Sequence, residues 1–294
     1  MIWTWLAAQL ALKATSVLAV GEGSVRRALA AALLAMAIVL PFLVPVAPLN
    51  VVLLCFLSII GLIKTTQVAA SGNDWPMGRR LWHLFGVADT RFARRVPRVM
   101  DLRALGVVLL NGVLLSGAVF ALTSLGGLSD LAYRVAWTVC AATIAVAGFE
   151  VFSGLVHVGY LAFGVDVPAL QRNPIVSRSL AEFWGQRWNR VVSGWLREFV
   201  FEPLARRRHP RLGLAAAFGA SGALHFWLIL GLGIGAAVQM AAYFLVQGAA
   251  LFVESRLGVR RAPPILGRAW TIAVLLVPLP LIFGPWLEAL DKQM

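Results

Sequence analysis

The stretch Ser179–Trp227 organises this chain: SLAEFWGQRWNRVVSGWLREFVFEPLARRRHPRLGLAAAFGASGALHFW. Its first half repeats apolar side chains three and four positions apart, which is the spacing of an amphipathic helix. The apolar positions are Leu180, Phe183, Trp184, Trp188, Val191, Val192, Trp195, Leu196 and Phe199. Because arginines occupy the opposite face, this helix is expected to lie in the headgroup layer of a membrane. The second half, after Arg211, is apolar enough to enter the bilayer, and it carries His225 with it.

The composition is that of an integral membrane protein. The chain is 60% hydrophobic and only 13% charged, and its mean hydropathy is +0.82. The net charge is +13, and the basic residues are expected to contact anionic membrane lipids rather than nucleic acid. No soluble domain is predicted that could bind in the groove of a nucleic acid. Cys55 and Cys140 both fall in apolar runs, so neither a disulfide nor a metal site is predicted.

Hydropathy predicts an all-α, polytopic protein with about eight membrane spans, each of roughly 20 residues. The predicted spans are near 2–20, 28–46, 48–63, 104–126, 132–164, 212–231, 233–253 and 269–289. Most of the 26 lysines and arginines fall in the connections after the first, third, fifth and seventh spans. This alternation predicts cytoplasmic basic loops and both termini outside, in a bacterial inner membrane or the endoplasmic reticulum. Residues 1–294 are predicted to form one membrane-embedded domain.

The basic loop at about 64–103 is predicted to be cytoplasmic. Its segments WPMGRRLWHLFGV and TRFARRVPRVM have the pattern of two short amphipathic pieces that lie on the membrane. His83 in the first segment, and His209 in the turn RRRHPR, are interpreted as interfacial residues without a chemical role.

A few polar side chains fall inside the predicted spans. Glu150 and His157 are seven residues apart and hence share one helix face, where they form either a structural tie between helices or a polar path. Gln239 and Gln247 are expected to hydrogen-bond across helices. Glu254, at the end of the same predicted span, is expected to pair with Arg256 or its neighbours.

His225 is the strongest candidate for chemistry. Ser221 and Gly222 precede it by one helical turn on the same face. Small residues there are expected to leave room beside the imidazole, and Ser221 could orient the ring.

Two segments resemble a known family. Pro174–Arg190, PIVSRSLAEFWGQRWNR, is similar to the signature of the wax synthase branch of the membrane-bound O-acyltransferases, in which a Pro-Ser-Leu lead-in precedes an FWG-x-RW element. SGALH at Ser221–His225 is similar to the second element of that family, a run of small residues ending in an intramembrane histidine. Gln186 and Phe226 depart from the usual pattern. The resemblance covers a core of about 170–230.

The resemblance implies transfer of an acyl group from a thioester to a hydroxyl, with acyl-CoA as co-substrate and no further cofactor. A long-chain alcohol is the first expectation for the acceptor, and a sterol, a diacylglycerol or the hydroxyl of a natural product or glycan are alternatives. His225 would be the general base and Asn189 its polar partner. A neutral imidazole in apolar surroundings can accept a proton near neutral pH, which agrees with that role. No Ser-His-Asp arrangement or HxxxxD pattern is evident, so direct transfer is favoured over an acyl-enzyme.

The remaining candidate residues are assigned to substrate binding. Guanidinium groups suit phosphates, and the CoA phosphates are expected to contact the basic face of the signature; each arginine could instead contact a lipid headgroup. The predicted substrate-binding residues are Trp184, Arg187, Trp188, Arg190, Arg197 and Ser221.

Two functions of other classes fit the same sequence. The chain could be a transporter or flippase in which intramembrane histidine and glutamate side chains, including Glu150 and His157, relay protons. It could also be a non-catalytic assembly partner that keeps the scaffold, in which case replacement of His225 would leave its role unchanged.

Overall fold

The computed structural model describes residues 2–21, 23–71 and 75–284, and the described chain is almost entirely helical. Its contacts divide it into two compact units. Unit 1 comprises Met1–Val87 and Trp195–Leu245, and unit 2 comprises Ala88–Gly194 and Val246–Met294. The boundaries cut through two helices, α8 and α11. The single membrane-embedded domain expected from the sequence stays a prediction.

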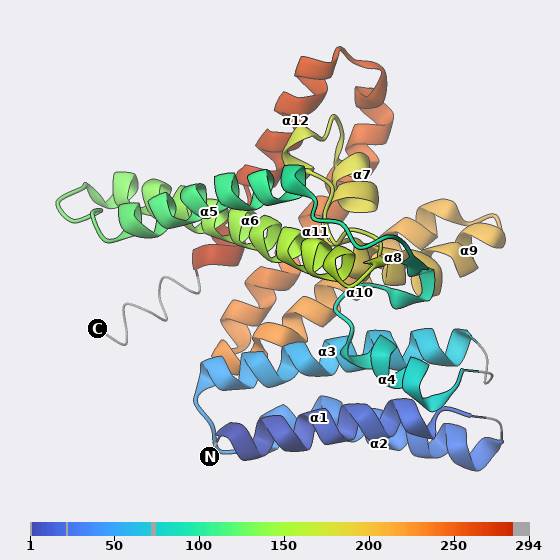
Figure 1. Cartoon of the computed structure of the whole chain (residues 1–294). Helices are drawn as coiled ribbons and strands as arrows, with labels where there is room; N and C mark the ends of the chain where they lie inside the picture. Colours follow the sequence, from blue (N-terminus) through green and yellow to red (C-terminus); the bar gives the residue numbers. More distant parts are fainter. Residues whose placement is uncertain (1, 22, 72–74, 285–294) are drawn as a thin grey trace. The chain divides into compact units, whose positions relative to one another are not determined.

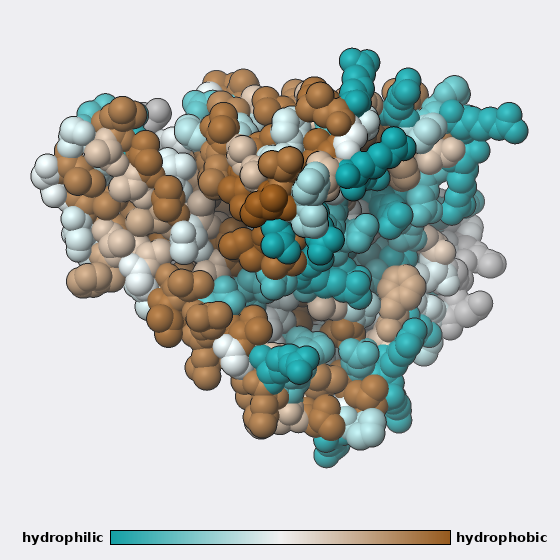
Figure 2. All heavy atoms as spheres, turned by 90° about the horizontal axis from the view of Figure 1, so that it is seen from above, coloured by the Kyte–Doolittle hydropathy of each residue, from teal (hydrophilic) through white to brown (hydrophobic). Residues whose placement is uncertain are grey.

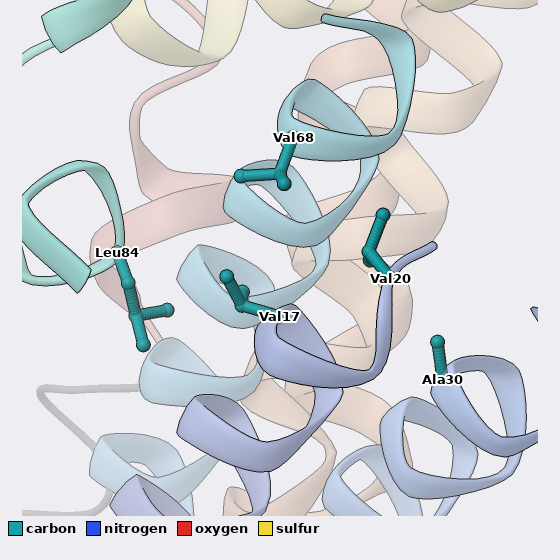
Figure 3. Packing of buried hydrophobic residues seen from close by; sticks show 5 residues of the cluster. All are labelled: Val17, Val20, Ala30, Val68 and Leu84. Carbon is teal, nitrogen blue, oxygen red and sulfur yellow. The ribbon is translucent and has the colours of Figure 1, made fainter. Parts of the chain in front are cut away.

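Unit 1 contains three long helices that lie side by side and a short helix packed against them (Figure 1). They are α1 (Ile2–Ala19), α2 (Ser24–Leu43), α3 (Pro48–Ala70) and α4 (Met77–Phe85). The unit continues with a π-helical turn (Arg197–Phe201), α9 (Glu202–Arg206), α10 (Pro210–Ile229), a 3-10 turn (Leu230–Leu232) and the first part of α11 (Ile234–Leu257). Figure 3 shows the buried apolar cluster of Val17, Val20, Ala30, Val68 and Leu84, to which α1 to α4 contribute.

Helix α1 is held in unit 1 by polar side chains as well as apolar ones. Gln9 Nε2 donates to the carbonyl oxygen of Ala37 at 2.8 Å, and the hydroxyl of Ser58 donates to the same oxygen at 2.7 Å. Further along α1, the hydroxyl of Ser16 lies 3.1 Å from that of Thr65. Because lipid tails are as apolar as the side chains, apolar contacts alone favour no particular pairing of helices in a membrane. Interhelical hydrogen bonds such as these help to fix which helices pack together.

Unit 2 is built around a hairpin of two long helices, α5 (Leu102–Leu122) and α6 (Asp130–Ala162) (Figure 1). Before it come a 3-10 turn (Thr90–Phe92) and β1 (Arg94–Arg95), which pairs antiparallel with β2 (Val165–Asp166) so that Arg94 faces Asp166. After it come a 3-10 turn (Pro174–Val176), α7 (Leu180–Glu182), a π-helical turn (Phe183–Arg187) and α8 (Arg190–Leu196). The second part of α11, a 3-10 turn (Val259–Arg261) and α12 (Pro264–Leu276) complete the unit.

Among the described residues, seven helical segments are long and apolar enough to cross a membrane. They are Ser24–Leu43, Pro48–Ala70, Leu102–Leu122, Asp130–Ala162, Pro210–Leu232, Ile234–Leu257 and Pro264–Gly284. These correspond to the second to eighth predicted spans; residues 285–289 of the last lie outside the described part. Brown, hydrophobic side chains cover much of the surface seen in Figure 2, as expected of a protein whose solvent is lipid. The chain is an all-α polytopic membrane protein.

The first predicted span is a helix, α1, but it is not among the seven that are long and apolar enough to cross a membrane. Its polar residues Gln9, Lys13 and Ser16 lower the hydropathy, yet all three are buried. They recur four and three positions apart, which places them on one face. A count of seven or eight spans therefore depends on α1, whose polar residues are buried within the protein.

The structure corrects the description of the basic loop. The third span continues to Ala70, so Lys64 is a buried residue of α3 rather than the start of the loop. The first amphipathic piece is the helix α4, but His83 is fully buried in unit 1, with Nε2 3.0 Å from Oε1 of Gln67. The interpretation of His83 as a surface residue is wrong, because α4 packs on α1 and α3. The second piece is not a helix: it holds a 3-10 turn and the strand β1.

Candidate active site

The predicted amphipathic helix over Leu180–Phe199 is interrupted in the middle. Trp188 is extended, with φ −88° and ψ 134°, and Asn189 has φ +37°, the left-handed region that non-glycine residues rarely adopt. Oδ1 of Asn189 accepts the backbone N–H of Val192 at 3.4 Å. Asn189 therefore begins α8 as a capping residue, since its side-chain oxygen accepts a main-chain N–H of the first turn. Asparagine also tolerates the left-handed backbone better than most residues do.

The segment before this break is fixed at its start by local hydrogen bonds. The hydroxyl of Ser179 accepts the N–H of Glu182 at 3.0 Å, and Glu182 Oε2 accepts the N–H of Arg178 at 2.7 Å. This reciprocal pattern resembles a capping box. Arg187 Nε donates to Glu182 Oε1 at 2.7 Å. Burial alone would raise the pKa of Glu182, but the Arg178 N–H and the Arg187 guanidinium together lower it.

Two side chains of α11 hold the same segment from outside it. Glu254 is buried, and its carboxylate accepts the N–H of Leu180 at 2.6 Å and that of Ala181 at 3.3 Å. Gln247 Oε1 accepts Nε1–H of Trp184 at 3.3 Å, while its amide nitrogen donates to a carbonyl oxygen of α12. The two residues are seven positions apart and hence on one face of α11.

Glu254 was expected to pair with Arg256 or its neighbours, and it pairs with Arg260 while also accepting hydrogen bonds from the main chain. The carboxylate is occupied by two backbone N–H groups, and the guanidinium near it is that of Arg260, at 3.9 Å. The expectation that Gln247 bonds across helices is confirmed by its bond to α12.

The aromatic residues of the signature form a stack inside unit 2. Phe183 and Trp188 lie nearly parallel, with ring centroids 5.6 Å apart and an interplanar angle of 12°. Phe149 of α6 contacts Trp188 edge to face at 5.6 Å. The stack fixes the backbone on both sides of the π-helical turn, and π-helical turns are frequent at functional sites.

The three arginines predicted to bind CoA differ in how many contacts their guanidinium groups make within the protein. Arg187 contacts Glu182 and donates to the carbonyl oxygen of Arg172 at 2.9 Å. Arg190 Nη1 donates to the carbonyl oxygen of Ala169 at 2.8 Å. The side chain of Arg197 is 65% exposed and lies 3.8 Å from Glu202, so it is the most available of the three to an anionic ligand.

His225 lies in α10, and its imidazole is oriented by the main chain. Nδ1 lies 2.8 Å from the carbonyl oxygen of Ser221. A carbonyl oxygen can only accept, so Nδ1 carries the hydrogen and donates it. In the neutral ring the lone pair is then on Nε2. Ser221 thus contacts His225 through its carbonyl group.

The surroundings of His225 in unit 1 are tightly packed on one side. The ring of Phe244 stacks on the imidazole, with centroids 3.9 Å apart. A Cβ atom at Gly222 would lie 3.4 Å from the carbonyl oxygen of Ala241. Gly222 was expected to leave room beside the imidazole, but that space is filled by α11, and the glycine instead allows α10 and α11 to pack closely.

The candidate residues are divided between the two units. Unit 2 holds Trp184, Arg187, Trp188, Asn189 and Arg190, and unit 1 holds Arg197, Ser221 and His225.

Glu254 and Glu182 were missed as residues that position the signature. The Ser-x-x-Glu spacing at Ser179 could have predicted the cap, whereas no local pattern indicates a partner for Glu254. Within the described residues, no three His, Cys, Asp or Glu side chains gather as metal ligands would.

Comparisons with known proteins converge on one family. Residues 167–247 match the model of the Membrane bound O-acyl transferase family. In Arabidopsis thaliana, the probable long-chain-alcohol O-fatty-acyltransferase 3 is 31% identical over 150 residues, which cover 44% of this chain and 43% of the relative. The acyl-CoA–sterol O-acyltransferase 1 of the same plant is 31% identical over 126 residues, 38% of this chain and 36% of the relative. The matched segments span less than half the length of these relatives. The matched region contains both signature segments, Pro174–Arg190 and Ser221–His225, so this part of the chain is similar to the membrane-bound O-acyltransferase family.

Proposed function

We propose that the protein transfers an acyl group from acyl-CoA to a hydroxyl acceptor in the membrane, with a long-chain alcohol as the preferred acceptor. The observation that carries the proposal is the hydrogen bond from Nδ1 of His225 to the Ser221 carbonyl oxygen. It holds the imidazole in the tautomer whose Nε2 can accept a proton, as a general base requires. The names of the relatives, alcohol and sterol O-acyltransferases, support a lipidic hydroxyl as acceptor.

The proposed reaction proceeds in one displacement. The acceptor oxygen attacks the thioester carbonyl carbon while Nε2 of His225 takes the hydroxyl proton. The carbon–sulfur bond then breaks, and the imidazolium returns the proton to the CoA thiolate. The products are an ester and free CoA, and His225 regains its starting state.

The donor is proposed to bind through the arginines of the signature region. Arg197 is exposed and carries a positive charge that suits a CoA phosphate. Arg187 and Arg190, which also bond to the protein's own backbone, would act mainly by shaping the segment around Trp184 and Trp188. Binding of membrane lipids through the same exposed guanidinium groups is compatible with this assignment.

The proposed function is tested with membranes that contain the protein and matched membranes that lack it. Both receive labelled acyl-CoA together with a long-chain alcohol, a sterol or a diacylglycerol, and the lipid products are separated by chromatography. We expect a labelled ester with the long-chain alcohol only where the protein is present. No ester with any acceptor, from folded protein, would contradict acyl transfer to these acceptors and would favour the transporter hypothesis.

Asn189 offers a test that separates catalysis from folding. Asn189→Asp keeps an oxygen that can cap α8 but loses the amide N–H donor. If Asn189 assists the chemistry through that donor, the variant should keep its thermal stability and lose about tenfold or more in kcat, since one hydrogen bond to a developing charge is worth roughly 1.5–3 kcal/mol. Asn189→Gly, which also tolerates the left-handed backbone, is the control for loss of the whole side chain. Full activity in Asn189→Asp would show that the residue serves only as a cap.

A further inference from the structure

The end of α8 is tied to α3 by a buried hydrogen bond within unit 1. Nε1–H of Trp195 donates to Oγ1 of Thr66 at 2.8 Å, and Trp195 is only 8% exposed. The Thr66 hydroxyl itself donates within α3, to the carbonyl oxygen of Leu62 at 2.8 Å. An indole N–H can only donate, whereas a hydroxyl that donates still has a lone pair with which to accept. Both groups are therefore paired in the role that their chemistry allows, and the bond fixes the end of α8 on α3.

The π-helical turn Arg197–Phe201 begins two residues after Trp195 and is held by two contacts. The ring centroids of Trp195 and Phe199 are 5.8 Å apart. A Cβ atom at Gly213 of α10 would lie 2.9 Å from the carbonyl oxygen of Phe201, a separation that Cβ atoms essentially never show. Glycine is therefore required where α10 approaches the turn. The turn packs against a tryptophan that is anchored to α3 and against the start of α10.

This turn carries Arg197, the arginine of the signature region that is most available to an anionic ligand. Its side chain is 65% exposed, and its ion pair with Glu202 is long, at 3.8 Å. His225 follows Gly213 on the same helix, about 18 Å further along the axis of α10. Arg197 and His225 belong to one unit, so the packing of the turn on α10 sets the distance between them.

We propose that Trp195 is a positioning residue for the acyl donor. Its hydrogen bond to Thr66 holds the turn so that Arg197 meets a phosphate of an acyl-CoA whose thioester lies at His225. The inference rests on the proposed acyl transfer, and it adds Trp195 and Thr66 as residues that act through Arg197 rather than on the substrate. Their loss should weaken donor binding and leave the chemical step unchanged, because a phosphate contact is the same in the ground state and the transition state.

Binding of an unreactive thioether analogue of acyl-CoA tests the inference without transfer. Trp195→Phe keeps an aromatic ring against Phe199 but lacks the N–H, and it should weaken binding about fivefold, the usual contribution of one hydrogen bond. Thr66→Val leaves the buried indole N–H unpaired and should weaken binding about tenfold. Thr66→Ser keeps the acceptor and should bind as the wild type does. The matched control is Thr15→Val, which removes an exposed hydroxyl that bonds to carbonyl oxygens of its own helix.

Two readouts separate positioning from a loss of stability. In the transfer assay, Trp195→Phe should raise KM for acyl-CoA about fivefold and leave kcat within about twofold of the wild type. A smaller folded fraction would instead lower kcat at an unchanged KM. Adding Trp195→Phe to Arg197→Gln should weaken binding of the thioether no further than Arg197→Gln alone, because Trp195 acts through Arg197.

Three results would overturn the inference. The first is additive losses in the double variant, and the second is a lower kcat at an unchanged KM in Trp195→Phe. The third is wild-type binding by both Trp195→Phe and Thr66→Val; if Arg197→Gln still weakens binding, the proposed donor site stands without the tether. A wild type that binds no thioether would reject acyl-CoA as the donor, and the inference with it. The two tether variants are independent, so misfolding of one leaves the other as the test.

Discussion

Replacement of His225 by alanine is expected to lower the rate of acyl transfer by about 10²–10⁴-fold, the usual contribution of a positioned general base. The reason is the fixed tautomer: Nδ1 donates to the carbonyl oxygen of Ser221 at 2.8 Å, so only Nε2 can receive the hydroxyl proton. Alanine leaves the hydroxyl without an acceptor for its proton. The measurement is kcat for ester formation from labelled acyl-CoA and a long-chain alcohol, at matched protein levels. KM for acyl-CoA should change little, because the base acts on the acceptor.

Two further measurements make the His225 result specific. His209→Ala, at an exposed histidine in the turn before α10, should retain full activity and controls for loss of an imidazole as such. The melting temperature of His225→Ala should be compared with that of the wild type, since the mutation removes the contact with Phe244. A folded His225→Ala protein that forms ester at the wild-type rate would reject His225 as the base while keeping the enzyme.

Replacement of Glu254 by alanine is expected to reduce kcat by about 100-fold or more, although the residue does not contact substrate in the proposed reaction. Its buried carboxylate accepts two N–H groups, those of Leu180 and Ala181. Each N–H left unpaired in a buried position costs about 1–3 kcal/mol, and a loss of ~2.7 kcal/mol corresponds to 100-fold in rate. We expect the start of the signature to shift to recover hydrogen bonds, and Trp184 and Trp188 to move with it.

The role of Glu254 as a positioning residue is separated from general destabilisation by two variants. Glu254→Gln keeps an acceptor oxygen of the same reach and should recover part of the activity. Ser255→Ala, at the exposed neighbouring position on α11, should behave as the wild type. Tryptophan fluorescence supplies a structural readout, because Trp184 and Trp188 lie in the segment that Glu254 holds. Wild-type kcat and an unchanged emission spectrum in Glu254→Ala would contradict the assignment.

The elements of this protein that could be predicted from the sequence are those that depend on neighbours within a few residues. Long apolar runs predict helices of spanning length, and seven of the predicted spans correspond to such helices. The orientation of His225 is also local, since its partner, the carbonyl group of Ser221, is one helical turn away. The resemblance of Pro174–Arg190 and Ser221–His225 to an acyltransferase signature indicated the family for the same reason: each motif is a short stretch of the chain.

The tertiary structure alone decided the features that depend on distant partners. Glu254 and Leu180 are 74 positions apart, and no periodicity relates them. His83 has the pattern of a surface residue on an amphipathic helix, yet the packing of α4 on α1 and α3 buries it. Helix α1 carries the polar residues Gln9, Lys13 and Ser16 within a predicted span, and only the fold shows that all three are buried. Apolar periodicity indicates which face of a helix avoids water. A hydrogen bond between polar groups requires two specific atoms to lie within bonding distance, and for residues far apart in the sequence only the fold brings them together.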